Sequence, residues 1–179
     1  MTEYKQVMLL GPDEVKSAGY VNYNVSDDTI GAAIRTSQNV YLRDVIGTSL
    51  LNKLQELVYN AIIGAEDNID SPENIAYKTL LDDYISDVLT YRVSMELCTY
   101  LTMKLRNIAL VKNADTNASP ASLEEVTFMQ EQYDTLFNDA LNRMSEFICA
   151  NKAAYPESDF LCGCGNSPKY ANTNLWLGK

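Results

Sequence analysis

The sequence predicts a mainly α-helical protein: an antiparallel bundle of about four helices, with a short N-terminal extended segment and an extended C-terminal arm. Apolar residues recur at helical spacing between residues 26 and 154. Serine, threonine or proline stands where the expected helices begin. After residue 155 the helical period ends, and glycine, asparagine, serine and proline become frequent. We therefore expect three parts: a segment at 1–25, the bundle at 26–154 and the arm at 155–179.

The N-terminal segment is expected to be irregular, with one short strand. Gly11-Pro12-Asp13 is typical of a turn, and residues 20–25 alternate as a half-buried strand does. Ser26 then offers a side-chain oxygen as an N-cap, and the two aspartates after it suit the positive end of a helix. The first helix of the bundle is expected to end near Gly47.

The second and third helices have start and stop signals of their own. Thr48 can cap the second helix, and Gly64 is a suitable C-terminal stop. Ser71-Pro72-Glu73 supplies an N-cap, a proline in the first turn and an acid for the third helix. The third helix is expected to run to about Lys112. It carries two adjacent apolar rows, which places it at the centre of the fold.

The fourth helix is expected to follow the Ser119-Pro120 start signal and to end before Pro156. Its apolar residues keep a helical period as far as Ile148. The connection from the third helix is short, so these two long helices are expected to be antiparallel neighbours.

Composition narrows the classes of function. The formal net charge is −10, from 14 Lys and Arg against 24 Asp and Glu, and there is no histidine. Affinity for nucleic acid depends on cationic contacts to phosphate, so we expect no sequence-specific DNA binding, although an acidic wall can line a passage for DNA. The absence of histidine removes the commonest general base and metal ligand. We therefore expect no catalytic residues, no cofactor and no metal site.

The cysteines and clustered carboxylates have simple interpretations. Cys98 and Cys149 lie on apolar helix faces, where reduced cysteine packs as a small hydrophobic group. Cys162 and Cys164 form a C-x-C pair without a second pair nearby, which leaves metal binding as a minor alternative. Five acids are expected to form a solvated face and not a cation site: Asp82, Asp83, Asp87, Glu124 and Glu125.

The arm is the strongest candidate for an interaction site. Its composition cannot form a compact core, and such terminal segments become ordered when something ties them down. We expect the arm to dock on another chain through Trp176, because tryptophan is enriched in interface hot spots. The candidate interface residues are Tyr170, Leu175, Trp176 and Leu177. The alternative is that the arm folds back on its own bundle.

Membrane insertion and export are not expected. No apolar run approaches the roughly 20 residues that span a bilayer. The sequence Met1–Glu14 lacks the basic region and long apolar stretch of a signal peptide. We expect the chain to stay in the cytoplasm in which it is made.

Three stretches carry a resemblance to a known family: Leu9-Leu10-Gly11-Pro12-Asp13-Glu14-Val15-Lys16, Asn24-Val25-Ser26-Asp27-Asp28, and Ile34 to Leu54. The third contains Thr36-Ser37-Gln38 and a G-T-x-L turn at Gly47-Thr48-Ser49-Leu50. Together they resemble the head–tail connector, or ring, proteins of tailed phages that infect Bacteroides-type gut bacteria, including crAss-like phages. The sequence departs from the family pattern where Leu51 replaces a common tyrosine and Asp44 a common proline.

The resemblance covers residues 9–54 in detail and the helical layout to about residue 150 loosely. It implies a helical adaptor subunit of the virion, of which about twelve copies form a ring under the portal. Such a ring completes the DNA channel and offers the tail a docking surface. The implied partners are other copies, the portal protein and other tail or ring proteins, and DNA passes through without sequence-specific binding. Two alternatives are a helical protein-binding module outside a portal ring and an enzyme that relies on carboxylates, lysine or tyrosine.

Overall fold

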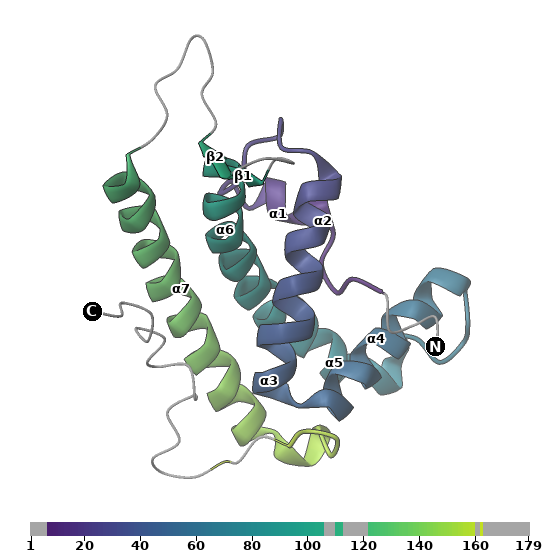
Figure 1. Cartoon of the computed structure of the whole chain (residues 1–179). Coiled ribbons are helices and arrows are strands. Elements are labelled where there is room, and N and C mark those ends of the chain that lie inside the picture. The colour runs from purple at the N-terminus through teal and green to yellow at the C-terminus, as the bar shows by residue number, and fades with distance from the viewer. Residues whose placement is uncertain (1–6, 106–109, 113–121, 160–161, 163–179) are drawn as a thin grey trace.

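The computed structural model describes residues 7–105, 110–112, 122–159 and 162, and this part of the chain is mainly helical, as expected (Figure 1). The α-helices are α1 (Pro12–Ser17), α2 (Asp27–Thr36), α3 (Arg43–Ile46), α4 (Thr48–Ile63), α5 (Ile75–Leu80), α6 (Ser86–Thr102) and α7 (Leu123–Ala150). The π-helical segments are η2 (Ser37–Leu42) and η4 (Leu81–Ile85), and the 3-10 turns are η3 (Pro72–Asn74) and η5 (Lys152–Ala154).

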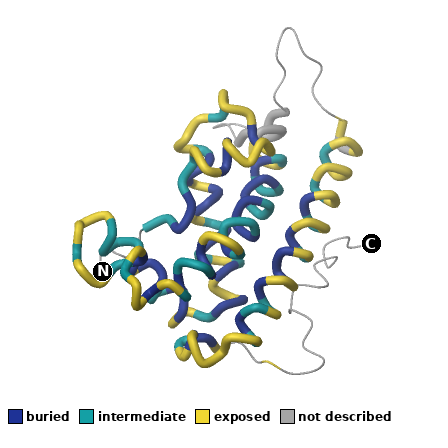
Figure 2. Tube along the Cα trace, turned by 180° about the vertical axis from the view of Figure 1, so that it is seen from behind, coloured by how far each residue is buried: buried dark blue, intermediate teal, exposed yellow. Residues whose placement is uncertain are grey.

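Helix α6 lies at the centre of the bundle, where the sequence predicted the third helix. It packs against α7 on one side and against α2 and η2 on the other. Helices α6 and α7 run antiparallel (Figure 1). The outer faces of α7 and of the α2–η2–α3 run are exposed (Figure 2). The order α2, α6, α7 therefore makes a layer of helices with two outer faces that differ in sequence.

The π-helical segments follow from the spacing of the buried residues. In the first run, the buried positions Ile34, Gln38, Leu42 and Ile46 recur every four residues. A regular turn holds 3.6 residues, so a strict four-residue spacing drifts around the helix. The wider π turn at η2 compensates for this drift and keeps the four side chains on one side. Segment η4 does the same for a second four-residue row: Tyr77, Leu81, Ile85, Leu89, Val93 and Leu97.

Two expectations for the N-terminal segment were wrong. Residues 12–17 form helix α1, because Pro12 suits a first turn and the side chain of Glu14 accepts a hydrogen bond from the Gly11 N–H at 2.5 Å. Residues 20–25 form a turn and not a strand. The Asn22 side chain accepts a hydrogen bond from the Asn24 N–H at 2.9 Å, which is a local alternative to strand pairing.

The expected end of the third helix was also wrong. Helix α6 stops at Thr102, and β1 (Met103–Leu105) pairs antiparallel with β2 (Leu110–Lys112), with Met103 opposite Lys112. The strand pair satisfies backbone groups that a continuing helix would have satisfied internally.

Helix α7 begins slightly later than expected and ends where expected. The predicted start at Ser119-Pro120 lies outside the described residues. The N-cap is Ser122, whose hydroxyl accepts from the Glu125 N–H at 3.1 Å, while the Glu125 carboxylate accepts from the Ser122 N–H at 2.7 Å. This reciprocal capping box satisfies two backbone donors. The helix ends at Ala150, before Pro156.

Among the described residues, a single hydrophobic core joins side chains from every α-helix, α1 to α7. Leu9, Leu10 and Val15, which precede the first long helix, are buried in the same cluster as Leu54 of α4 and Leu141 of α7. The N-terminal segment therefore contributes side chains directly to the interior of the bundle.

Candidate interaction surface

The candidate interface residues of the arm, Tyr170, Leu175, Trp176 and Leu177, lie outside the described residues. Docking of the arm therefore stays a prediction. The described residues of the arm between Tyr155 and Cys162, however, make several contacts with the chain's own bundle.

The first of these contacts is a disulfide between Cys149, at the end of α7, and Cys162. The expectation that Cys149 is a buried, reduced thiol was wrong: its side chain is only partly buried and is bonded to the other cysteine. Cys162 was considered as half of a C-x-C metal pair, but in this structure its sulfur is engaged by Cys149, while Cys164 lies outside the described residues. Burial raises the pKa of the Cys98 thiol, which disfavours its reactive thiolate form.

Two tyrosines hold the chain after α7 against α5. Tyr155 is buried and its hydroxyl donates to the Ala76 carbonyl oxygen at 2.8 Å, while the Tyr77 hydroxyl donates to Glu157 Oε2 at 2.8 Å. Burial raises the pKa of Tyr155 to about 12, because it disfavours the phenolate. Burial, followed by the hydrogen bond to Glu157, also raises the pKa of Tyr77.

The same segment approaches the turn between α3 and α4. Gly47 has φ 87° and ψ 158°, a conformation that is essentially restricted to glycine. A Cβ atom at this position would lie 2.9 Å from Asp159 Oδ2. Both the backbone conformation and the neighbouring side chain therefore require glycine in the G-T-x-L turn.

Two buried glutamines bind the backbone of the N-terminal segment. Gln38 Oε1 accepts a hydrogen bond from the Leu9 N–H at 2.8 Å, and Gln38 Nε2 donates to the Val7 carbonyl oxygen at 3.0 Å. Gln55 Nε2 donates to the same Val7 oxygen at 3.2 Å. Both glutamine side chains are buried, so these bonds satisfy polar groups that water cannot reach.

A partly buried ion pair within α6 lies against the Tyr41 ring of η2. The Arg92 guanidinium carbon is 3.5 Å from the centre of the Tyr41 ring, and Arg92 Nη2 is 2.6 Å from Glu96 Oε1. The two charged side chains are only 12% and 16% exposed. A cation stacked on an aromatic ring and paired with a carboxylate holds η2 against α6.

A groove with a volume of about 430 Å³ lies between α1 and the η4–α6 junction. Glu14, Asp82 and Asp87 line it together with Tyr20 and Tyr91. Burial raises the pKa of Asp82. Asp82 and Asp83 are exposed, as expected, but Asp87 is partly buried and forms an ion pair with Arg143 at 3.3 Å. Among the described residues, no group of three or more His, Cys, Asp or Glu is placed to hold a metal ion.

The first part of α7 presents a different kind of surface. None of the described side chains from Ser122 to Gln132 is buried, whereas Tyr133 and the inward positions after it enter the core. Phe128 is 58% exposed, and Met129 and Leu136 are exposed beside it. Glu124 and Glu131 stand four residues before and three after Phe128, so these three side chains share one face of the helix. We call Glu124, Phe128 and Glu131 the α7 stripe.

The α7 stripe was missed at the level of sequence, where Glu124 was interpreted only as part of a solvated face. It is exposed, as that interpretation requires. The signal that could have found the stripe is Phe128 itself, because it falls outside the helical row that Val126, Tyr133 and Phe137 define. Aromatic residues are enriched at interfaces, so a phenylalanine on the polar side of a helix marks a candidate interface.

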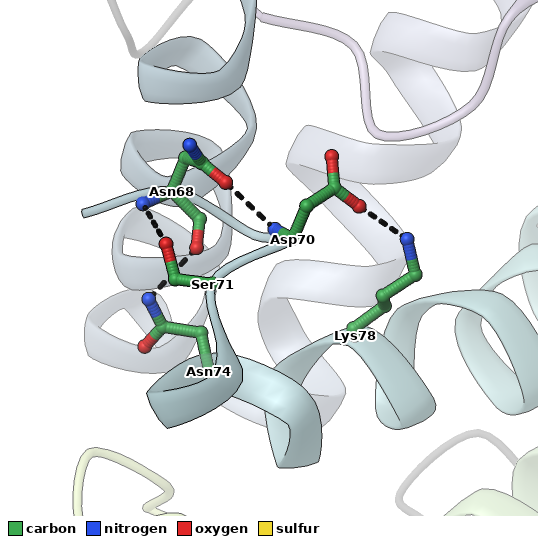
Figure 3. A network of polar contacts seen from close by, with 5 residues as sticks. All are labelled: Asn68, Asp70, Ser71, Asn74 and Lys78. Carbon is green, nitrogen blue, oxygen red and sulfur yellow. Dashed lines mark hydrogen bonds and ion pairs between the residues drawn. The ribbon is translucent and has the colours of Figure 1, made fainter. Parts of the chain in front are cut away.

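A network of polar contacts holds the loop between α4 and α5 (Figure 3). Asn68, Ser71 and Asn74 satisfy one another's polar groups: the Asn68 N–H donates to Ser71 Oγ at 3.1 Å, and Asn74 Nδ2 donates to the Asn68 carbonyl oxygen at 2.8 Å. The Asp70 N–H donates to Asn68 Oδ1 at 2.8 Å, and the Asp70 carboxylate pairs with Lys78 of α5. Ile62, Ile63 and Ile75 are exposed on the two helices beside this loop.

Comparison with known proteins adds one relationship. Residues 42–168 match a family that is described only as a family of unknown function, DUF6712. No curated protein and no solved structure matches the chain. Among the helices of the described residues, none combines the length and apolar character needed to cross a bilayer.

Proposed function

The chain belongs to the DUF6712 family, whose function is unknown, and we propose that it is a structural subunit of the ring that joins the portal of a tailed phage to its tail. Its activity is assembly, without catalysis or a cofactor. Copies of the chain, about twelve, bind head to tail and close into a ring around the path of the DNA. The ring contacts the portal on one side and tail or ring proteins on the other.

The observation that carries this proposal is the contact between Gln38 and Leu9. The resemblance to connector proteins rests on residues 9–16 and 34–54, which are separate in the sequence. In the fold these segments meet, because Gln38 binds the backbone on both sides of residue 8, at Leu9 and at Val7. Glutamine at this motif position therefore has a structural role that depends on the first segment. This interdependence favours a shared fold over a chance similarity of short motifs.

The glycine of the G-T-x-L turn supports the same conclusion. Gly47 has a backbone conformation that other residues avoid and lies against Asp159. The turn sets the direction in which α4 leaves α3. Two residues that carry the resemblance, Gln38 and Gly47, thus set the geometry of the N-terminal half.

The distribution of exposed surface suits a ring subunit. A cyclic assembly joins unlike patches of each copy, so it needs two different faces that point away from each other. The outer faces of α7 and of α2–η2–α3 lie on opposite sides of α6. The net charge of −10 suits the channel, since an acidic wall repels phosphate and lets DNA pass.

The decisive experiment is electron cryo-microscopy of particles of the phage that encodes this chain. We expect a closed ring on the portal axis, in contact with the portal protein. If the chain is absent from the particle, or lies away from the portal axis, the connector proposal is wrong. In that case the alternative, a helical protein-binding module with a heteromeric partner, would take its place.

A further inference from the structure

We propose that the α7 stripe of one copy binds the exposed face of α2–η2–α3 on the next copy. The inference rests on the proposed ring function and adds to it the two surfaces that meet. The occupant of the α7 stripe is therefore a second copy of this chain. The argument comes from the charges on the two faces, their spacing and their positions in the bundle.

The face of α2–η2–α3 carries the complementary charge. Arg35, Val40 and Arg43 are all exposed on this helical run. Arg35 forms no ion pair with any residue that the structure describes. Arg43 lies 3.6 Å from the adjacent Asp44, close to the outer limit for an ion pair. Two exposed arginines around a valine are notable in a chain with a net charge of −10.

The two faces match in pattern as well as in charge. On α7, Glu124 and Glu131 are seven residues apart, or about 10 Å along a helix. On the other run, Arg35 and Arg43 are eight residues apart, and the wider turns of η2 between them make this distance shorter than the about 12 Å of a regular α-helix. Each pair of charges has an exposed apolar side chain between its members, Phe128 in one case and Val40 in the other. Two helices packed along each other can therefore place each glutamate near an arginine, with Phe128 beside Val40, which lies about a quarter turn from the row of the two arginines.

The position of the two faces allows the contact to repeat. Helix α6 separates α7 from α2 and η2, so one copy cannot bring its own two outer faces together. The contact must form between copies, and each copy keeps one face free for the next neighbour. Such a heterologous contact continues around a ring until it closes. Arginine and phenylalanine are both enriched at interfaces of this kind.

Charge reversal tests the contact on the full chain. Variant A carries Glu124→Arg and Glu131→Arg, and variant B carries Arg35→Glu and Arg43→Glu. We expect the wild type to self-associate in sedimentation velocity over a concentration series. Each variant alone should associate roughly tenfold more weakly or worse, because like charges then face each other. An equimolar mixture of A and B should recover association, since every contact in an alternating ring is again between opposite charges.

Two controls show whether an effect is specific. The chain with all four reversals should self-associate like the wild type. Glu73→Lys changes an exposed charge in η3, which is part of neither face, and should leave association unchanged. Far-ultraviolet circular dichroism checks that A and B keep the helical fold, and recovery in the mixture excludes unfolding as the cause of weaker association.

The results of these experiments distinguish a failure of the proposed contact from a failure of the connector proposal. If A and B associate as strongly as the wild type, or if the wild type stays monomeric at every concentration, the α7 stripe does not bind a second copy and the inference is wrong. Neither result decides the connector proposal, which electron cryo-microscopy of the particles tests separately. If the α7 contacts are confirmed in solution but particles show no ring on the portal axis, the inference stands and the connector proposal fails.

Discussion

Gln38 Oε1 lies 2.8 Å from the backbone nitrogen of Leu9, 29 residues earlier in the chain. The amide nitrogen of the same side chain donates to Val7, so one glutamine replaces two hydrogen bonds that a neighbouring strand would otherwise supply. This arrangement lets an extended segment enter a helical core without leaving its backbone polar groups unpaired.

Replacement of Gln38 should therefore destabilise the fold. Gln38→Met keeps much of the side-chain volume but leaves the Leu9 N–H without its partner, and we expect a loss of about 1–3 kcal/mol in the free energy of unfolding. Chemical denaturation followed by circular dichroism measures this loss. The matched control is Gln132→Met on the exposed part of α7, which should change stability by less than about 0.5 kcal/mol. Equal effects of the two substitutions would contradict a specific role for Gln38.

Gly47→Ala should be more harmful than Gly64→Ala. Both glycines have positive φ, but Gly64 is in the ordinary left-handed region and has open space around its Cα. Gly47 combines a glycine-only conformation with the close approach of Asp159, so we expect a loss of about 1–3 kcal/mol or more. Thermal unfolding of the two variants measures the difference. Adding Asp159→Ala to Gly47→Ala should recover only the part due to the contact, and no recovery at all would mean that backbone strain dominates.

The disulfide between Cys149 and Cys162 should stabilise the protein in its oxidised form. It closes a short loop with a sequence separation of 13 residues, and in the chain-entropy view such a cross-link contributes about 3 kcal/mol. We expect a dithiol reductant to lower the free energy of unfolding by up to this amount. Cys149→Ser should show the lower value with and without reductant. A reductant effect that persists in Cys149→Ser would assign the stabilisation to other cysteines.

Stability should fall at high pH because of Tyr155. Its pKa is raised from 10.0 to about 12 in the fold, so below pH 10 the phenol is neutral in both the folded and unfolded states. As the pH rises from 10 towards 12, the unfolded chain ionises first and is stabilised by this ionisation, so the stability of the folded state is lost over this window. Denaturation at a series of pH values, together with tyrosinate absorbance, tests this behaviour. Tyr155→Phe should reduce the slope, whereas Tyr23→Phe, at a position that is 71% exposed, should not.

The sequence predicted the features that depend on local signals. The apolar rows, Ser26, Pro72 and Gly64 located the long helices and placed the third helix at the centre, because amphipathic period and capping act within a few residues. Helix α1 was missed because Gly11-Pro12-Asp13 fits a turn as well as a helix start. The π segments were missed although the four-residue spacing from Ile34 to Ile46 was present in the sequence.

Other features could not be predicted because they join distant residues. The pairing of Cys149 with Cys162, the approach of Asp159 to Gly47 and the contact of Gln38 with Leu9 depend on how the helices pack. The two faces of the proposed interface were hidden for a similar reason. Whether Glu124 or Arg35 has an ion-pair partner depends on which elements pack beside it. From the sequence alone, both residues are interpreted as ordinary surface charges.

The hydrophobic core contains Leu9, Ile30 and Ile34, which all precede the region that matches the family. The matched region starts at residue 42, inside the continuous helical run from Asp27 to Ile46. A fragment that began there would lose these three buried side chains from the core that they share with Leu54 and Ile85. The unit of detectable sequence similarity is therefore smaller than the unit of folding. Expression of this protein, or of a relative, should include the preceding helix and its N-terminal segment.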